Sequence, residues 1–591
     1  MAEGKARETH VFVSGNPGRD VQRVGTARWL GEDPTLIHER VWGVLGNLGD
    51  SQCYLGVRSK VDAVHQALSA RVARDGLPIR LIAPGFTLAV SDGQLNGTAQ
   101  MRYSLIGREA VNDATELHLR ASDMAGVIAV VACDKPPVGT LAAILDFNVP
   151  AVLLSDGSIH PGVDPVTNER LDIVAAFQVA SADDETRTRT ALHACPGQGS
   201  CGGMFTYNTM QTFIAVLGME PLHMVAPASE DPRRLEPFPA ELVDCLVTMR
   251  NIGLRPRDIV TPAALRNAVT VTMAMGGSTN VALHAVELAR SAGLDFWGQV
   301  MSQEEFNDLS SRLPVLVNMR PFGAYSMVDV EDVGGLPVIV AELLRGGWLE
   351  GSARTCTGET LAEQVARLAP PAPDGEVVHP LATPFKATGG LRLLHGNLAP
   401  DGGAILKLAG VERGIVDGRF IGRARVFDSE QSLIDTLADR PEVISDGDMI
   451  VIRYVGPRGA PGMPEMLDPT SRITALCRQR DITVALMTDG RFSGGSVGLV
   501  IGHISPEAYL AGPIALVEDG DTVTVDLEGN HLDCAELADP PTAQQRLAAW
   551  QAAAAANGGE HPNVVAIEGR LLRRMRSTAR SALDGGGMHD G

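Results

Sequence analysis

The chain contains no long apolar segment. Its first ten residues, MAEGKARETH, lack the apolar run of a secretory signal peptide. No later stretch reaches the ~18 uninterrupted apolar residues that a membrane span requires. We therefore expect a cytoplasmic protein with no membrane-embedded part.

Clustered positive charge is also scarce. The formal net charge is -21 and the isoelectric point is near 5.1, and the basic residues are too dispersed to track a phosphate backbone. Nucleic acid is therefore not an expected partner. One basic stretch stands near the C-terminus, and we predict that it forms the solvated face of a helix without a function of its own. It comprises Arg570, Arg573, Arg574, Arg576 and Arg580.

Closely paired cysteines of the zinc-finger kind are missing as well. The eight cysteines are widely spaced, at positions 53, 133, 195, 201, 245, 356, 477 and 534. In a reducing compartment such cysteines serve as buried thiols or metal ligands more often than as disulfides. Cys133 and Cys201 lie in polar, glycine-rich segments, which makes them candidate ligands of iron.

What the chain does contain is the pattern of an α/β protein. Short apolar runs at 78–91, 126–132 and 149–155 each lead into a polar loop, and a segment of helical period at 60–74 precedes them. This alternation predicts βαβ units around a parallel sheet. Loops at the carboxyl ends of such strands are where ligands bind.

The length of the chain predicts two domains, because 591 residues are many for one hydrophobic core. The proline-rich segment 369–375 can continue neither a helix nor a central strand. We place the boundary there, between an α/β domain at 1–368 and a smaller domain at 376–591. Runs of β-branched residues predict that the second domain is β-rich, and the glycines at 585–591 are expected to fray.

Polar residues that suit metal binding follow the predicted strands of the first domain. Cys133-Asp134-Lys135 and Asp92 each stand at a strand end, and Cys201 lies in a glycine-rich loop. Thiolates and carboxylates in such loops suit iron and a hard cation side by side. Taken singly, the segments have plainer interpretations, namely a buried thiol beside a surface ion pair and an ordinary Asp-Gly turn.

Two loops of the second domain carry further candidates. Gly456–Met466 is too broken by glycine and proline to form a helix or strand, and it presents Glu465. Thr488–Ser496 places Ser493 in a glycine-flanked turn, where it can act as a nucleophile or, near metals that lower its pKa, as a base. A phosphate-binding loop is the competing interpretation, but no Gly-Lys-Ser/Thr ending is present.

Together these segments resemble the dihydroxy-acid dehydratase and sugar-acid dehydratase family. The shared signatures are Cys-Asp-Lys, Gly-x-Cys-x-Gly-Met, Gly-Pro-x-Gly-x-Pro-Gly-Met-x-Glu-Met and Thr-Asp-Gly-Arg-Phe-Ser-Gly. Three further matches are Gly276–Asn280, Gly396–Gly402 and Gly502–Ala508. All seven occur in order across most of the chain, and the loops of the second domain are closer to dihydroxy-acid dehydratase than to the sugar-acid enzymes.

The resemblance implies an iron–sulfur cluster held by Cys53, Cys133 and Cys201. Three thiolates leave one iron with an open position for a substrate hydroxyl. The cluster is 2Fe-2S or 4Fe-4S, with 2Fe-2S favoured. On spacing alone Cys195 competes with Cys201. Cys53 stands in a Ser-Gln-Cys-Tyr context, where family members commonly show Thr-Pro-Cys-Asn.

The resemblance also implies Mg²⁺ on Asp92, Asp134, Glu465 and Lys135. Because a protonated amine repels a cation, Lys135 can be a ligand only if its amine is neutral or is converted by CO₂ to a carbamate, and the resemblance implies the carbamate. Ser493 and Lys135 are the implied catalytic residues, with Ser493 as general base. Loss of the C2 proton and of the C3 hydroxyl would turn a 2,3-dihydroxy acid into an enol and then into a 2-keto acid.

The favoured substrates are the 2,3-dihydroxy-3-methyl acids of branched-chain amino-acid biosynthesis. The alternative substrate is a sugar acid such as gluconate or a pentonate. The resemblance further implies a homodimer or a dimer of dimers. A non-catalytic iron–sulfur sensor is an alternative of another class, although a sensor has no reason to keep Ser493, Glu465 and Lys135.

Overall fold

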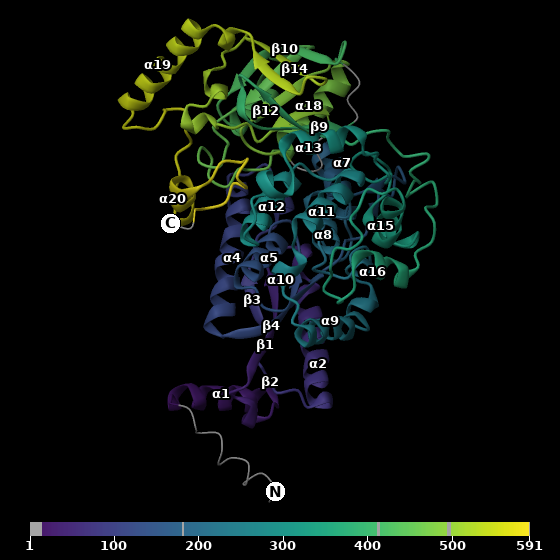
Figure 1. Ribbon diagram of the computed structural model, residues 1–591. Helices are drawn as coiled ribbons and strands as arrows, with labels where there is room; N and C mark the ends of the chain where they lie inside the picture. The colour runs from purple at the N-terminus through teal and green to yellow at the C-terminus, as the bar shows by residue number, and fades with distance from the viewer. Residues whose placement is uncertain (1–14, 180–181, 410–413, 493–497, 590–591) are drawn as a thin grey trace, which may run out of the picture.

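The computed structural model describes residues 15–179, 182–409, 414–492 and 498–589. It confirms the predicted fold class, an α/β region with a parallel sheet followed by a β-rich region. In Figure 1 the β-rich region lies at the top of the molecule and the parallel sheet runs below it, with helices on both sides.

The N-terminal sheet contains five parallel strands within the described ranges. They are β1 Arg40–Leu48, β2 Ile79–Leu81, β3 Gly85–Leu88, β4 Met124–Val131 and β5 Ala151–Ser155. β1 pairs with β2 and β3 on one side and with β4 on the other. β4 is buried along nearly its whole length, as expected for a parallel strand covered on both faces. The small strands β6 Gly162–Val163 and β7 Arg170–Leu171 form a separate pair.

Helices enclose this sheet, and α2 shows why the sequence forms them. Its buried positions Val57, Val61, Val64, Leu68 and Val72 recur at helical spacing, and the helix ends at a glycine with positive φ, a common C-cap. The helices of the α/β region are α1 Pro17–Leu30, α2 Val57–Asp75, α3 Asp92–Leu95, α4 Tyr103–Ala121, α5 Pro136–Phe147, α6 Ile173–Gln178, α7 Asp184–His193, α8 Thr206–Val216, α9 Phe238–Ile252, α10 Pro256–Ile259, α11 Pro262–Ala274, α12 Asn280–Ser291, α13 Gln303–Arg312, α14 Met327–Asp332, α15 Leu336–Arg345 and α16 Leu361–Leu368.

The C-terminal region is built on a closed barrel, which leaves no exposed sheet edge. The strands are β8 Leu391–Gly396, β9 Ala399–Ala409, β10 Arg419–Phe427, β11 Asp448–Ile452, β12 Ala485–Thr488, β13 Gly498–Gly502, β14 Thr522–Asp526 and β15 His531–Cys534. β10, β11, β12 and β13 are successively parallel, so the loops after β11 and β12 leave the same end of the barrel. The helices are α17 Glu430–Asp439, α18 Leu467–Arg480, α19 Pro540–Ala556 and α20 Arg570–Thr578.

The predicted linker 369–375 is neither helix nor strand and follows α16. The α/β region has one large hydrophobic core, and the barrel interior has another. The boundary between 1–368 and 376–591 remains a prediction. No helix of the described residues is long and apolar enough to cross a membrane.

Two expectations for the C-terminus are wrong. The glycines at 585–587 and Met588 are buried rather than frayed, because they pack between helices of the α/β region. The basic stretch is not a purely solvated face either, since Arg576 is only 8% exposed and its guanidinium donates to backbone carbonyls of Arg458 and Gly459.

Candidate metal and cluster site

Three neighbouring strands of the parallel sheet bring their predicted ligands to one edge. β1 leads to a short 3₁₀ turn that contains Cys53, β3 leads to Asp92 at the start of α3, and β4 leads to Cys133, Asp134 and Lys135. All these positions follow the carboxyl ends of parallel strands, where ligand sites of α/β sheets form. Cys133 has a positive φ of 63°, a strained backbone conformation of the kind found at functional sites.

The barrel contributes the opposite wall. Glu465 lies in the loop after β11, and Arg491 lies in the loop after β12. The two loops are held together by a backbone bridge between these residues, and the Met466 amide donates to the Arg491 carbonyl at 3.0 Å. Glu465 and Arg491 are both buried, so the site lies between the sheet and the barrel.

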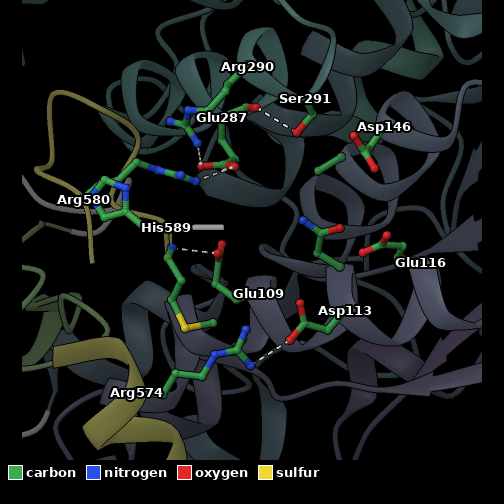
Figure 2. Close-up of a pocket in the computed structure, with 13 residues that line it drawn as sticks. Glu109, Asp113, Glu116, Asp146, Glu287, Arg290, Ser291, Arg574, Arg580 and His589 are labelled. Atoms are coloured by element: carbon green, nitrogen blue, oxygen red, sulfur yellow. Dashed lines mark hydrogen bonds and ion pairs between the residues drawn. The ribbon is translucent and has the colours of Figure 1, made fainter. Parts of the chain in front are cut away.

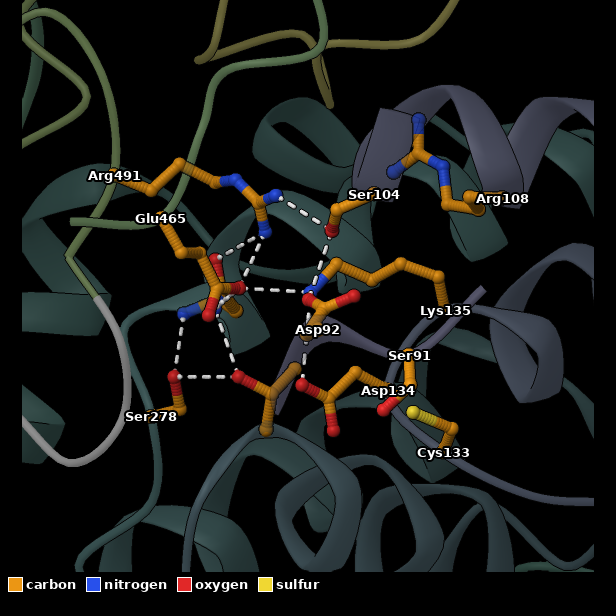
Figure 3. A network of polar contacts seen from close by, with 12 residues as sticks. Ser91, Asp92, Ser104, Arg108, Cys133, Asp134, Lys135, Ser278, Glu465 and Arg491 are labelled. Carbon is orange, nitrogen blue, oxygen red and sulfur yellow. Dashed lines mark hydrogen bonds and ion pairs between the residues drawn. The ribbon is translucent and has the colours of Figure 1, made fainter. Parts of the chain in front are cut away.

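Lys135 is the centre of the polar network in Figure 3. Its ammonium nitrogen lies 2.5 Å from Asp92 Oδ2 and 2.7 Å from Glu465 Oε1, and 3.9 Å from Asp134 Oδ2. The side chain is 1% exposed. Burial and the Arg491 charge disfavour the ammonium, but the three carboxylates outweigh them and raise the pKa of Lys135. An amine therefore neutralises the centre of a carboxylate cluster.

The carboxylates around Lys135 fit a divalent cation. Oxygen atoms of Asp92, Asp134 and Glu465 lie within 4.8 Å of one another, and hard cations prefer such oxygen ligands. Asp92 Oδ1 is buried with no hydrogen-bond partner among the described residues. Burial opposes ionisation of Asp92, but Lys135 and Arg491 keep the pKa of its carboxyl below the usual value. The pKa of Asp134 is raised well above its usual value, first by burial.

Three side chains that sequence reasoning gave no role fix this arrangement. Arg491 donates to Glu465 Oε1 at 2.6 Å and to Ser104 Oγ at 3.1 Å. Asn280 donates to the same Glu465 oxygen at 2.8 Å, and Ser104 donates to Asp92 Oδ2 at 2.8 Å. Arg491 lies in the Thr-Asp-Gly-Arg-Phe-Ser-Gly signature and Asn280 in the Gly276–Asn280 match, so a sequence signal existed for both. Ser104 had none.

The predicted thiol ligands line a cavity next to the carboxylates. A cavity of about 210 Å³ is walled by Cys53, Cys133, Cys195 and Cys201, and Asp134 forms part of the same wall. All four cysteines are free thiols. The donor set and the cavity fit an iron–sulfur cluster held by thiolates. The cavity includes both Cys195 and Cys201, so the alternative that spacing left open stays open.

The thiols need a positive partner to ionise. A hydrogen bond with Cys53 and then burial raise the pKa of Cys133 well above its usual value, and burial does the same for Cys201. Burial raises the pKa of Cys195 to about 12. Thiols of this kind lose their protons when they bind a metal.

Gln52 explains one departure from the family pattern around Cys53. Its side-chain amide nitrogen donates to the backbone carbonyls of Cys195 and Gly197 at 3.0 and 3.2 Å. Its backbone carbonyl accepts a hydrogen bond from the Gly199 amide at 3.0 Å. These bonds fasten the Cys53 turn to the loop that leads to Cys201. Ser493, the predicted base, lies outside the described residues.

Comparisons with known proteins identify the family of the chain. The family model described as the N-terminal part of dihydroxy-acid/6-phosphogluconate dehydratase matches residues 53–364, and the model of the C-terminal part matches residues 376–586. The chain belongs to this family. The predicted resemblance is therefore confirmed, and the protein is a hydro-lyase by family.

Three relatives share the name dihydroxy-acid dehydratase. A dihydroxy-acid dehydratase of Renibacterium salmoninarum is 42% identical over 476 residues, which cover 79% of this chain and 80% of the relative. One from an Arthrobacter species is 40% identical with the same coverage. One from Streptococcus pneumoniae is 41% identical over 455 residues, or 76% of this chain and 77% of the relative.

Proposed function

We propose that the protein dehydrates 2,3-dihydroxy-3-methyl acids to 2-keto acids, as in branched-chain amino-acid biosynthesis. The observation that carries the proposal is the junction of two sites, in which Asp134 borders both the carboxylate cluster and the thiol cavity. A 2,3-dihydroxy acid offers matching chemistry, with a carboxylate and a C2 hydroxyl for a hard cation and a C3 hydroxyl for iron. The names of the relatives favour this substrate class over a sugar acid.

The reaction removes one water and changes no oxidation state overall. A base takes the proton from C2, the C3 hydroxyl takes up a proton and leaves as water, and the resulting enol gains a proton at C3 and loses its hydroxyl proton at C2 to become the 2-keto acid. Mg²⁺ and the cluster, when bound, supply Lewis acidity toward the developing enolate and the leaving hydroxyl. Asp92, Asp134 and Glu465 would hold Mg²⁺, and Cys53, Cys133 and Cys201 would hold the cluster.

Lys135, as a carbamate, would be a further ligand of Mg²⁺. Addition of CO₂ to its neutral amine, with loss of a proton, would replace a positive charge by a negative one among the cation ligands. The buried contacts to Asp92 and Glu465 show that the side chain already reaches the centre of the carboxylates. Intact-protein mass spectrometry and a ¹³C NMR carbamate signal after loading with ¹³CO₂ would detect the adduct, and Lys135→Met should lack both.

Ser493 is the proposed base, on the family resemblance alone. Its assigned step is removal of the C2 proton from the bound acid. Ser493→Ala should lower kcat by at least about 100-fold, the usual contribution of a positioned base, while leaving iron and Mg²⁺ content unchanged. Normal turnover by this variant would remove Ser493 from the mechanism.

Substrate class is tested by anaerobic turnover of the reconstituted protein with Mg²⁺. 2,3-Dihydroxyisovalerate, gluconate and a pentonate are offered side by side, and 2-keto acid is measured. Preference for dihydroxyisovalerate supports the proposal, and preference for a sugar acid replaces it. A loaded cluster without turnover of any of the three would favour the non-catalytic sensor.

The identity of the third thiol ligand is tested by iron content. Cys201→Ser should lose the cluster and Cys195→Ser should keep it, if Cys201 is the ligand as the family loop indicates. The opposite result would assign Cys195. The absorption spectrum of the anaerobic protein would distinguish 2Fe-2S from 4Fe-4S.

We also propose a homodimer or a dimer of dimers in the cytoplasm. The reducing cytoplasm suits thiolate ligands. Two exposed leucines, Leu55 at 63% and Leu88 at 84%, follow Cys53 and precede Asp92 in the chain and offer apolar surface near the cluster cavity. Sedimentation analysis of the loaded protein tests the assembly, and a monomer at micromolar concentration would contradict it.

A further inference from the structure

The chain end folds back onto the α/β region. α20 lies beside α4 at the left of Figure 1, near the C-terminus. After α20 the chain reverses, since Ala579 and Met588 form an antiparallel bridge and the His589 amide donates to the Thr578 carbonyl at 2.9 Å. We refer to residues 569–589 as the C-terminal clasp.

Buried charges on α4 and α12 bind the clasp. Arg108, 1% exposed, donates to the Gly585 carbonyl at 3.0 Å and pairs with Glu109 at 2.8 Å. The Met588 amide donates to Glu109 at 2.9 Å, and Arg580 lies 3.4 Å from Glu287 on α12. Figure 2 shows Glu109 and Glu287 in contact with the clasp at the wall of a cavity of about 470 Å³. The clasp therefore joins two helices whose contacting residues, Arg108 and Glu287, are 179 positions apart in the sequence.

An apolar cluster extends the clasp to the loop that carries Glu465. Met463 of that loop is buried together with side chains from α4, α12 and the clasp. The cluster consists of Leu105, Ile106, Leu283, Met463, Leu572, Met575, Ala579, Ala582 and Met588. A side chain at Gly586 would begin 3.3 Å from the Met463 sulfur, so the glycine permits close approach of the two segments.

Hydrogen bonds fasten the same loop at its start. Arg458 Nε donates to the Ala579 carbonyl at 2.9 Å. In return, Arg576 donates to the carbonyls of Arg458 at 3.1 Å and Gly459 at 2.9 Å. The Glu465 loop is thus held by the clasp through both polar and apolar contacts.

The elements held by the clasp are those that shape the candidate Mg²⁺ site. Ser104, which contacts Asp92, is one helical turn before Arg108 on α4. Asn280, which contacts Glu465, is one turn before His284 on α12. Arg108 and His284 are themselves 3.1 Å apart. The hydrogen bonds and ion pairs of the clasp described above lead to α4, α12 and the Glu465 loop.

We propose that the C-terminal clasp is a positioning element for the Mg²⁺ site, with Met588 as its apolar anchor. It fixes α4, α12 and the Glu465 loop, so that Ser104 and Asn280 hold the Asp92 and Glu465 carboxylates in place, and it has no part in holding the cluster. The inference rests on the Mg²⁺ site proposed above. Groups that orient first-shell ligands commonly change metal affinity when removed.

The test is calorimetric titration of MgCl₂ into anaerobic, cluster-loaded protein, with iron content measured on the same samples. Met588→Ala should weaken Mg²⁺ binding about 10-fold, the lower range for loss of ligand-supporting contacts, and leave iron content unchanged. Turnover should recover at saturating MgCl₂. Met588→Leu, which preserves volume, should bind Mg²⁺ as the wild type does.

Met249→Ala is the matched control, because Met249 is also buried but lies on α9 in the main core. It should destabilise the protein without changing Mg²⁺ affinity. If Met588→Ala does not fold, Arg458→Met removes the tie to Ala579 while keeping the aliphatic stem, and the same loss of affinity is expected.

If Met588→Ala, or Arg458→Met where that variant is needed, binds Mg²⁺ with wild-type affinity, the clasp does not position the Mg²⁺ site. The proposed function would remain intact. An equal loss of affinity in Met249→Ala would also overturn it, because the effect would then be general destabilisation. A wild-type protein that binds no Mg²⁺ would overturn the metal site itself and the clasp with it.

Discussion

The two halves of the candidate site are built on different principles. In the carboxylate half, the positively charged side chains of Lys135 and Arg491 form ion pairs with the buried acids at 2.5–2.7 Å. The thiol half surrounds a cavity of about 210 Å³, and two of its thiols, Cys133 and Cys201, have pKa values well above the usual range. One half is neutralised by ion pairs and the other by protons.

Each half must therefore give up a different partner to bind a metal. In the carboxylate half a divalent cation competes with the Lys135 ammonium, which is why carbamylation matters there. In the thiol half, iron competes with protons. The folded metal-free protein should therefore depend on the carboxylate half for stability and depend little on the thiol half.

The largest effect should follow removal of the Glu465 charge. Glu465→Gln would leave two buried cations, Lys135 and Arg491, without their shared carboxylate. Breaking a buried pair from one side costs about 3–5 kcal/mol, so we expect a loss of that size in the unfolding free energy of the metal-free protein, measured by urea denaturation. Mg²⁺ binding should be lost as well.

Glu220→Gln is the control for that loss. Glu220 is fully buried and accepts hydrogen bonds from Ser155, and burial raises the pKa of its carboxyl to about 7. It forms no ion pair within the described part of the chain, so its substitution should change stability by less than about 1 kcal/mol. Equal losses in the two variants would mean that the ion pairs do not stabilise the site.

Protonation of Glu507 should stabilise the loop that carries Glu465. Glu507 accepts the backbone amides of Arg458 and Gly459, and burial raises the pKa of its carboxyl to about 8. A carboxyl whose pKa is raised by folding stabilises the protein fully below its unfolded value near 4.5, and this contribution is lost as pH rises through about 8.

Glu507→Gln copies the protonated acid and should remove this dependence. Between pH 5 and pH 8 the wild type should lose about 3.5 kcal/mol more stability than the variant, on the order of two and a half pKa units of linkage. Melting curves across that range measure the difference. Parallel pH profiles of the two proteins would show that Glu507 is ionised at neutral pH.

Loss of a thiol should affect the metal far more than the fold. Cys133→Ala should abolish iron binding, yet it should cost the metal-free protein only about 1 kcal/mol, because a small apolar group replaces a neutral thiol. Cys356→Ala, at another fully buried cysteine, should keep its iron. A metal-free Cys133→Ala protein that is as unstable as Glu465→Gln would erase the distinction between the two halves.

Local patterns predicted the parts of the site that follow strands. Asp92 and the Cys133-Asp134-Lys135 segment were found because apolar runs ending in polar residues mark the carboxyl ends of parallel strands. The structure brings Asp92, Asp134, Lys135 and Glu465 together. The β-rich second region followed in the same way from β-branched runs.

Contacts between distant segments were beyond local patterns. The glycines at 585–587 look frayed in sequence, but Arg108 and Glu109, more than 450 positions earlier, bury them. In the sequence Ser104 is an ordinary helix residue. Its role is visible only in the fold, where its hydroxyl donates to Asp92 Oδ2 at 2.8 Å. The central place of the Lys135 amine depends on contact between the α/β region and the barrel loop of Glu465, which no single segment encodes.

The smallest effect should come from Gln52, which belongs to the thiol half but binds no metal. Gln52→Ala removes the side-chain hydrogen bonds to Cys195 and Gly197. Because the residue is exposed, the loss of unfolding free energy should be only about 0.5 kcal/mol. The same bonds hold the Cys53 turn against the loop of Cys201, so iron release to a chelator should still be faster than in the wild type. Gln431→Ala, which removes an exposed bond on α17, should match the stability loss and leave iron release unchanged. If both variants release iron at the wild-type rate, the cluster ligands are held by the strand ends alone.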